Sequence, residues 1–207
     1  IGAAPGTETN PIMLSEQENT VENAGTTWYQ GYFSGMILTV TGENFTVTYN
    51  GETLTPVDGV VTTAVKSANP RMPVVFAITG EGTYTANFTY PIGNMENPAQ
   101  LVIGENTASI EAGNTQGYFF TWTAPAFGEL SITMPEGDWM YCINNMTTYV
   151  YGDTQWSDSD PVVNPAEIEV AAGDEIQIIV NTYNPADMWS NPAGELVVVA
   201  AFVEYGT

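Results

Sequence analysis

Aromatic rings and hydrogen-bonding side chains alternate in two turn-rich stretches of the second half of the chain. Residues 145–160 and 182–192 combine tyrosine and tryptophan with aspartate, asparagine and glutamine. An aromatic face matches the C–H face of a pyranose ring, while carboxylates and amides hydrogen-bond its hydroxyls. The pattern therefore favours a sugar site. With one further turn, these stretches supply ten candidate contacts: Trp156, Trp189, Tyr149, Tyr151, Tyr183, Asp153, Gln155, Asp158, Asn184 and Phe127.

The same residues have plainer interpretations. A tryptophan in a long loop often pins that loop to its own domain. Asp153 and the acidic run at 158–160 offer the oxygen ligands that calcium prefers, although their spacing matches no EF-hand loop. We expect no metal and no cofactor, with calcium as the alternative for this acidic run.

The composition excludes most catalytic centres. The chain has no histidine, which removes Ser-His-Asp and Cys-His nucleophiles and histidine metal clusters. It has no glycine-rich phosphate loop, and its basic residues are Lys66 and Arg71 alone. Paired carboxylates hydrolyse glycosides, but small β-domains leave little room for a deep cleft. We expect a protein that is not an enzyme.

The charge balance narrows the partners. The formal net charge is -22, so nucleic acid and anionic membranes are repelled and neutral sugars or cations remain. A single cysteine, Cys142, forms no internal disulfide, and we expect it to be buried. No apolar run is long enough to span a membrane. We expect a monomeric, secreted protein on the exterior of a bacterium.

An internal repeat organises the chain. Asn10-Pro11 and Asn19-Thr20 recur as Asn97-Pro98 and Asn106-Thr107, and an aromatic run follows in each half. Apolar alternation, with turn residues at short intervals, predicts strands throughout. Asn50-Gly51 predicts a hairpin turn, because both residues tolerate positive φ.

These signals predict an all-β chain of two tandem immunoglobulin-like antiparallel β-sandwiches, at residues 9–93 and 94–207. In the second repeat we expect strands at 107–111, 117–123, 129–134, 139–144, 166–170, 174–181 and 194–203. Trp139 aligns with Phe45 and is expected in the core, whereas Trp122 could lie in the core or on a sheet face.

The two repeats differ in loop length. Aligning them predicts insertions in the second repeat around 124–127, within 145–160 and within 182–192. These would follow its second, fourth and sixth strands. Loops after alternate strands leave a sandwich at the same end, and function gathers where loops vary on a fixed scaffold. We expect the three enlarged loops to form one surface that carries the candidate contacts.

The chain also resembles a known family. Residues 97–107, Ala112-Gly113, Gly117-Tyr118-Phe119 and 168–180 look like the tandem β-sandwich modules of gut Ruminococcus-type surface proteins. The resemblance is strongest to the starch-binding domains of starch adherence system (amylosome) proteins. It implies a non-catalytic module that binds α-glucan or maltooligosaccharide at the cell surface, beside other modules in a dockerin–cohesin assembly.

We therefore expect a carbohydrate-binding module with a preference for starch-like glucans. Three alternatives remain: a spacer without its own ligand, a protein-binding adhesin, and a binder of β-glucan or cellulose. The sequence does not decide whether the first repeat binds a ligand.

Overall fold

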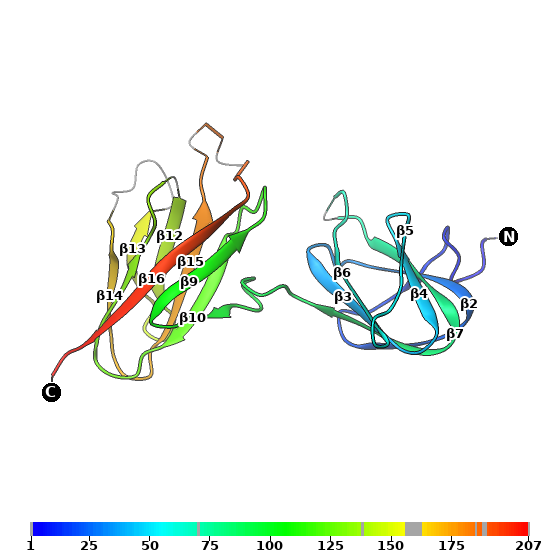
Figure 1. Ribbon diagram of the computed structural model, residues 1–207, viewed down its shortest axis with the longest axis horizontal. Helices are drawn as coiled ribbons and strands as arrows, with labels where there is room; N and C mark the ends of the chain where they lie inside the picture. Colours follow the sequence, from blue (N-terminus) through cyan, green and yellow to red (C-terminus); the bar gives the residue numbers. More distant parts are fainter. Residues whose placement is uncertain are drawn as a thin grey trace. The chain divides into compact units, whose positions relative to one another are not determined.

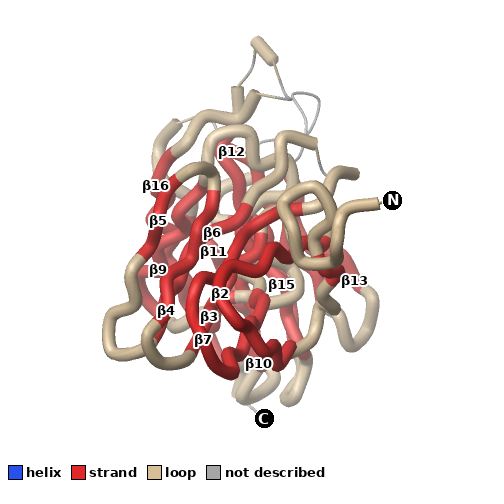
Figure 2. Tube along the Cα trace, turned by 90° about the vertical axis from the view of Figure 1, so that its right-hand side faces the viewer, coloured by secondary structure: helices blue, strands red, loops and turns tan. Residues whose placement is uncertain are grey.

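A computed structural model describes residues 2–69, 71–137, 139–155, 163–184, 186–187 and 190–206. Every secondary-structure element in these residues is a β-strand (Figures 1 and 2). The all-β prediction is confirmed. No helix in this part of the chain is long and apolar enough to cross a membrane.

The chain divides into two compact units, residues 1–91 and 92–207. Each unit has its own hydrophobic core. The first core gathers around Phe76 and Leu38, and the second around Tyr141 and Ile178.

Two long strands connect the layers of the first unit. β2 pairs along its whole length with residues 74–86 of β7, with Gly25 opposite Gly80. β3 pairs with the second half of β7 and β4 with its first half, so the two long strands pass from one layer to the other. The strands are β1 (Ile12–Met13), β2 (Asn19–Gly31), β3 (Met36–Thr41), β4 (Phe45–Tyr49), β5 (Glu52–Leu54), β6 (Val60–Val65) and β7 (Val74–Thr89).

The second unit consists of two separate sheets around one core. The order is β13-β12-β15-β10-β8 in one sheet and β14-β11-β16-β9 in the other. Apolar side chains of both sheets alternate inward and form a single cluster. The strands are β8 (Ala99–Gln100), β9 (Gly104–Ile110), β10 (Tyr118–Thr123), β11 (Gly128–Thr133), β12 (Trp139–Asn145), β13 (Val150–Gln155), β14 (Ala166–Val170), β15 (Glu175–Thr182) and β16 (Gly194–Glu204).

The strand order is that of a jelly roll. Counted from β9, one sheet contains the sixth, third, eighth and first strands, and the other contains the fifth, fourth, seventh and second. An immunoglobulin sandwich instead keeps its first, second, fourth and fifth strands in one sheet. The observed order therefore does not support the immunoglobulin-like prediction. The first unit has the same order when each half of β2 and β7 is counted as a strand.

The repeat is visible in matched hydrogen bonds. Asn19 Nδ2 donates to Ser15 O and Gln17 O, and Asn106 Nδ2 donates in the same way to Val102 O and Gly104 O. In each unit a short leading strand runs parallel to the aromatic strand, β1 to β2 and β8 to β10. The sequence repeat therefore corresponds to a structural repeat.

Several local predictions are confirmed. All seven strands expected in the second unit are present, each within a few residues of its predicted bounds. Trp139 is buried in the core, and so is Trp122, whose position the sequence left open. Asn50 and Gly51 both have positive φ at the β4–β5 turn. Cys142 differs from expectation, because it is half-buried on β12 beside Asn144 and Thr154.

Candidate functional site

The connections of the second unit separate into two groups at opposite ends of its sheets. At one end, the turns around 124–127, 146–149 and 171–174 hydrogen-bond to one another: Ala124 N donates to Asp174 O, and Met146 N donates to Glu175 O. At the other end, the 111–117 connection meets the β15–β16 connection, where Gly113 N donates to Asn191 O. We call the first group the Asp174 end and the second the Asn191 end.

The candidate contacts do not meet at one end. Phe127 and Tyr149 lie at the Asp174 end, whereas Tyr183 and Asn184 follow β15 at the Asn191 end. The eight residues of β15 separate these ends by roughly 25 Å. The expectation that the enlarged loops share one surface is therefore wrong for the described residues. Trp156, Asp158 and Trp189 lie outside the described residues.

Two details of the loop alignment also change. Tyr151, Asp153 and Gln155 were expected in a loop, but they belong to β13, which pairs with β12. The four-residue insertion expected around 124–127 lies instead in the 111–117 connection. This connection divides β9 from β10, whereas β2 of the first unit continues unbroken.

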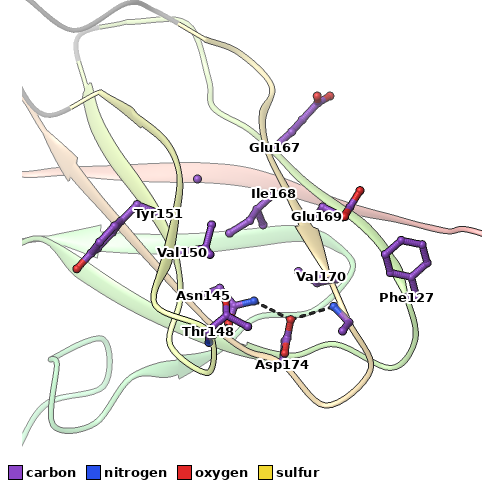
Figure 3. Close-up of a pocket in the computed structure, with 12 residues that line it drawn as sticks. Phe127, Asn145, Thr148, Val150, Tyr151, Glu167, Ile168, Glu169, Val170 and Asp174 are labelled. Atoms are coloured by element: carbon purple, nitrogen blue, oxygen red, sulfur yellow. Dashed lines mark hydrogen bonds between the residues drawn. The ribbon is translucent and has the colours of Figure 1, made fainter.

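A groove lies where β13 and β14, the outer strands of the two sheets, face each other near the Asp174 end (Figure 3). Its volume is about 470 Å³, within the range of small-molecule sites. It is lined by Phe127, Asn145, Thr148, Val150, Tyr151, Gly152, Glu167, Ile168, Glu169, Val170, Ala171 and Asp174. Two of the ten candidate contacts, Phe127 and Tyr151, line it; Tyr149 lies between the lining residues Thr148 and Val150, and Asp153 hydrogen-bonds to the lining residue Glu167.

A buried polar network forms the floor of the groove. The Asp174 Oδ2 atom accepts hydrogen bonds from Asn145 Nδ2, at 2.7 Å, and from Ala171 N, at 2.9 Å (Figure 3). Asn145 Oδ1 in turn accepts from Thr147 N and Thr148 N. A buried carboxylate that satisfies two donors fixes the 146–149 and 171–174 turns in one geometry. The groove is thus preorganised at its base.

The groove closes where β13 approaches β14. A Cβ atom on Gly152 would lie 3.2 Å from Glu167 O and 3.2 Å from Ile168 Cβ, so a larger residue would require β14 to shift by a few tenths of an ångström. The Asp153 Oδ2 atom accepts a hydrogen bond from Glu167 N at 3.0 Å. Asp153 therefore takes the place of a neighbouring strand at the edge of β14, and its role in this structure is to position the wall.

The backbone of β14 faces the groove at Glu169. In an antiparallel ladder, alternate residues turn their N–H and C=O groups towards the paired strand. Because Glu167 N donates to Asp153, the backbone groups of Glu167 point away from β11. The backbone groups of Glu169, two residues further along, point the same way. The wall thus presents a backbone donor and acceptor as well as the two glutamate side chains.

Two exposed aromatic rings stand at opposite rims. Tyr151 on β13 is 75% exposed, and Phe127, before β11, is 49% exposed (Figure 3). Phe127 packs edge-on against Tyr205, with ring centroids 5.3 Å apart. The Tyr205 hydroxyl donates to Glu129 Oε2, and this hydrogen bond, with nearby glutamates, raises the pKa of the phenol. Tyr149, at φ 58° in the β12–β13 turn, is also exposed.

Charge at the groove has one sign. Both basic residues of the chain belong to the first unit, so residues 92–207 contain no lysine, arginine or histidine. Glu167 and Glu169 are exposed on the wall. A ligand with carboxylate or sulfate groups would find no cation to pair with, which favours neutral ligands.

Sequence reasoning missed most of the lining. The Ala-Glu-Ile-Glu-Val run of β14 indicated a half-buried strand but gave no sign that its glutamates border a groove. Asn145 and Asp174 are far apart in sequence, and no pattern joins them. Among the described residues, no group of three or more histidine, cysteine, aspartate or glutamate side chains is placed to hold a metal ion.

The comparisons with known proteins identify no family. No family model matches the chain, and no curated protein matches it. Among solved structures, the chain is similar to the CUB1-EGF-CUB2 domains of rat MASP-1, with 8% sequence identity and a TM-score of 0.22, over 91% of this chain and 99% of that one. A likeness at this level indicates neither the fold nor the function.

Proposed function

We propose that this chain is a non-catalytic carbohydrate-binding module whose β13–β14 groove binds a neutral glycan, with starch-like α-glucans preferred. The observation that carries the proposal is the pair of exposed rings, Tyr151 and Phe127, at the rims of a groove whose largely apolar lining also includes carboxylate, amide and hydroxyl groups. Rings of this kind stack on the apolar faces of sugars, while carboxylates and backbone groups bind the hydroxyls.

The binding mode follows from the lining. Between the two rings, the Glu169 backbone and the polar side chains of the lining are available to the hydroxyls of a bound sugar. Each stacked ring contributes about 1 kcal/mol, and wet hydrogen bonds add modestly, so we expect a Kd between roughly 1 μM and 1 mM. The preference for α-glucan over β-glucan comes from the family resemblance, because stacking alone is similar for both.

We extend the proposal to the setting of the protein. A chain with one cysteine and a strongly acidic surface suits a secreted bacterial protein, acting beside other modules of the same assembly. The module would hold polysaccharide close to enzymes carried elsewhere, without catalysis of its own.

Isothermal titration with maltooligosaccharides, cello-oligosaccharides and xylo-oligosaccharides tests the proposal. We expect heat with the maltooligosaccharides and a Kd raised roughly fivefold by Tyr151→Ala and by Phe127→Ala. Tyr32→Ala is the matched control, because Tyr32 is an exposed ring (58%) in the first unit. A chain that binds none of the three series, and is not retarded in starch or cellulose gels, is a spacer or adhesin instead.

A further inference from the structure

The first unit has a groove at the same place in its fold, but with a different edge. It lies between β5 and β6, the counterparts of β13 and β14, and its volume is about 540 Å³. Every residue that lines it is uncharged, and none is aromatic. This groove therefore lacks the stacking rings and carboxylates on which the proposed glycan site depends.

The outer edge of β6 is left open. The backbone N–H and C=O groups of Val60 point away from β3, because they hydrogen-bond to Val57 across a tight turn. Alternation along the strand then turns Thr62 and Ala64 outward as well. The next outward position, Lys66, is occupied, because its N and O atoms hydrogen-bond to Tyr49 Oη. The open edge is thus two residues long and blocked at both ends, and Ala64 O, which also accepts a long hydrogen bond from Thr63 Oγ1 at 3.4 Å, keeps a second lone pair for another strand.

The matching edge of the second unit is protected and this one is not. In the second unit, Asp153 caps Glu167 N, glutamates fill the edge, and β13 lies against β14. β6 reads Val-Val-Thr-Thr-Ala-Val, and β5 makes no comparable approach to it. Proteins usually guard such an edge with charge, proline or a covering segment, because bare edges pair with other strands.

We propose that the edge of β6 pairs with the same edge of a second copy of this chain, in an antiparallel and two-fold symmetric arrangement. Because Thr62 and Ala64 are the two open positions, the register is fixed: Thr62 of each copy lies opposite Ala64 of its partner. This register uses the backbone groups of both residues in both copies. It is self-complementary, as a two-fold interface requires.

Charge complementarity supports a second copy as the occupant. In this register, Lys66 of each copy lies beside the 57–60 turn of the other, which carries the exposed Asp58. Lys66 is one of only two basic residues in a chain of net charge -22, and its position at the end of the open edge gives the acidic Asp58 of a second copy a cation to pair with. The proposed dimer differs from the monomer expected from the sequence, and this proposal does not depend on the proposed glycan site.

Disulfide trapping tests the register directly. In a Cys142→Ser background, Thr62→Cys and Ala64→Cys chains are prepared separately and then mixed. Directly opposite residues lie about 5.5 Å apart between Cα atoms, which suits a disulfide, whereas Thr62 and its own copy lie about 7 Å apart or more. We expect disulfide-linked dimers in the mixture and not in either chain alone. Equal cross-linking of Thr62→Cys alone, or none in the mixture, would overturn the proposal.

Sedimentation of the unmodified chain gives an independent test. We expect the mass to rise with concentration towards twice the 22.3 kDa of one chain. Ala64→Asp should weaken the association at least tenfold, because it places a charge at the centre of the pairing. Ala201→Asp is the matched control on an exposed strand position of the second unit and should leave the association unchanged. A chain that stays monomeric up to millimolar concentration, or equal effects of both variants, would contradict the proposal. If an extended peptide binds at this edge while the chain does not self-associate, the edge is a peptide site, and that result also contradicts the proposed dimer.

Discussion

Asp174→Ala should destabilise the second unit strongly. The carboxylate is 6% exposed and accepts hydrogen bonds from Asn145 Nδ2 and Ala171 N. Alanine leaves the buried Asn145 Nδ2 without an acceptor, at about 1–3 kcal/mol, and also removes the hydrogen bond from the partly buried Ala171 N, at about 1 kcal/mol. We expect a loss of roughly 3 kcal/mol, a large part of the 5–15 kcal/mol that stabilises a typical domain.

Urea unfolding followed by tryptophan fluorescence measures this effect. Four of the five tryptophans lie in the second unit, so the signal reports mainly on that unit. A loss of about 3 kcal/mol lowers the midpoint by roughly 1–3 M urea. Glu195→Ala, at an exposed strand position of the same unit, is the control. An Asp174→Ala midpoint equal to that of the control would refute the role assigned to the network.

Three further results are expected. Asn106→Ala should lower the stability of the second unit by about 1–3 kcal/mol in urea unfolding, because the side chain accepts one hydrogen bond and donates two. Asn19→Ala should lower the stability of the first unit in the same way. An effect near zero at both sites would contradict the structural equivalence of the two asparagines. Gly152→Val should lower the stability of the second unit by about 1–3 kcal/mol and weaken glycan binding, since the new side chain pushes β13 away from β14. Unchanged unfolding and titration curves would show that β13 and β14 are not in tight contact at Gly152. Burial raises the pKa of Tyr29 above its usual 10.0, so the unfolded chain loses this proton at a lower pH than the folded chain, and stability falls as the pH rises above about 10. In an absorbance titration at 295 nm, Tyr29→Phe should remove a late-ionising tyrosine. An unaltered titration curve would argue against the burial of Tyr29.

The strands and the repeat could be predicted because both depend on local signals. Alternation of apolar residues, as in Ile176, Ile178 and Val180, identifies a strand whose inner face is buried. The recurrence of Asn10-Pro11 and Asn19-Thr20, in the same order, in the second half of the chain located the repeat. The two asparagines at 19 and 106 make equivalent hydrogen bonds.

Strand pairing could not be predicted in the same way. A jelly roll and an immunoglobulin sandwich contain similar strands with similar turns, and they differ in which strands become neighbours. That choice depends on contacts between distant residues, such as Leu130 with both Ile168 and Phe202, and periodicity along the chain does not record it. The same limit applied to β13, an edge strand whose residues are exposed or half-buried without alternation.

The candidate site was predicted by residue type and only partly by position. Aromatic residues in turns directed attention to Phe127 and Tyr151, which border the groove. Glu167, Glu169 and Asp174 were missed, because acidic residues are common on the surface of this chain and nothing local distinguishes these three. Tyr183 and Asn184 were grouped with them by loop length, and the strand order places them at the other end.

A titration of ¹⁵N-labelled protein with maltoheptaose, followed by amide chemical shifts, tests the location of the proposed glycan site most directly. We predict saturable shifts at Thr148, Val150, Gly152 and Glu169, with the amides of the first unit unchanged. Shifts confined to 111–117 and 190–193 at the Asn191 end, or no shifts at any glucan concentration, would contradict it.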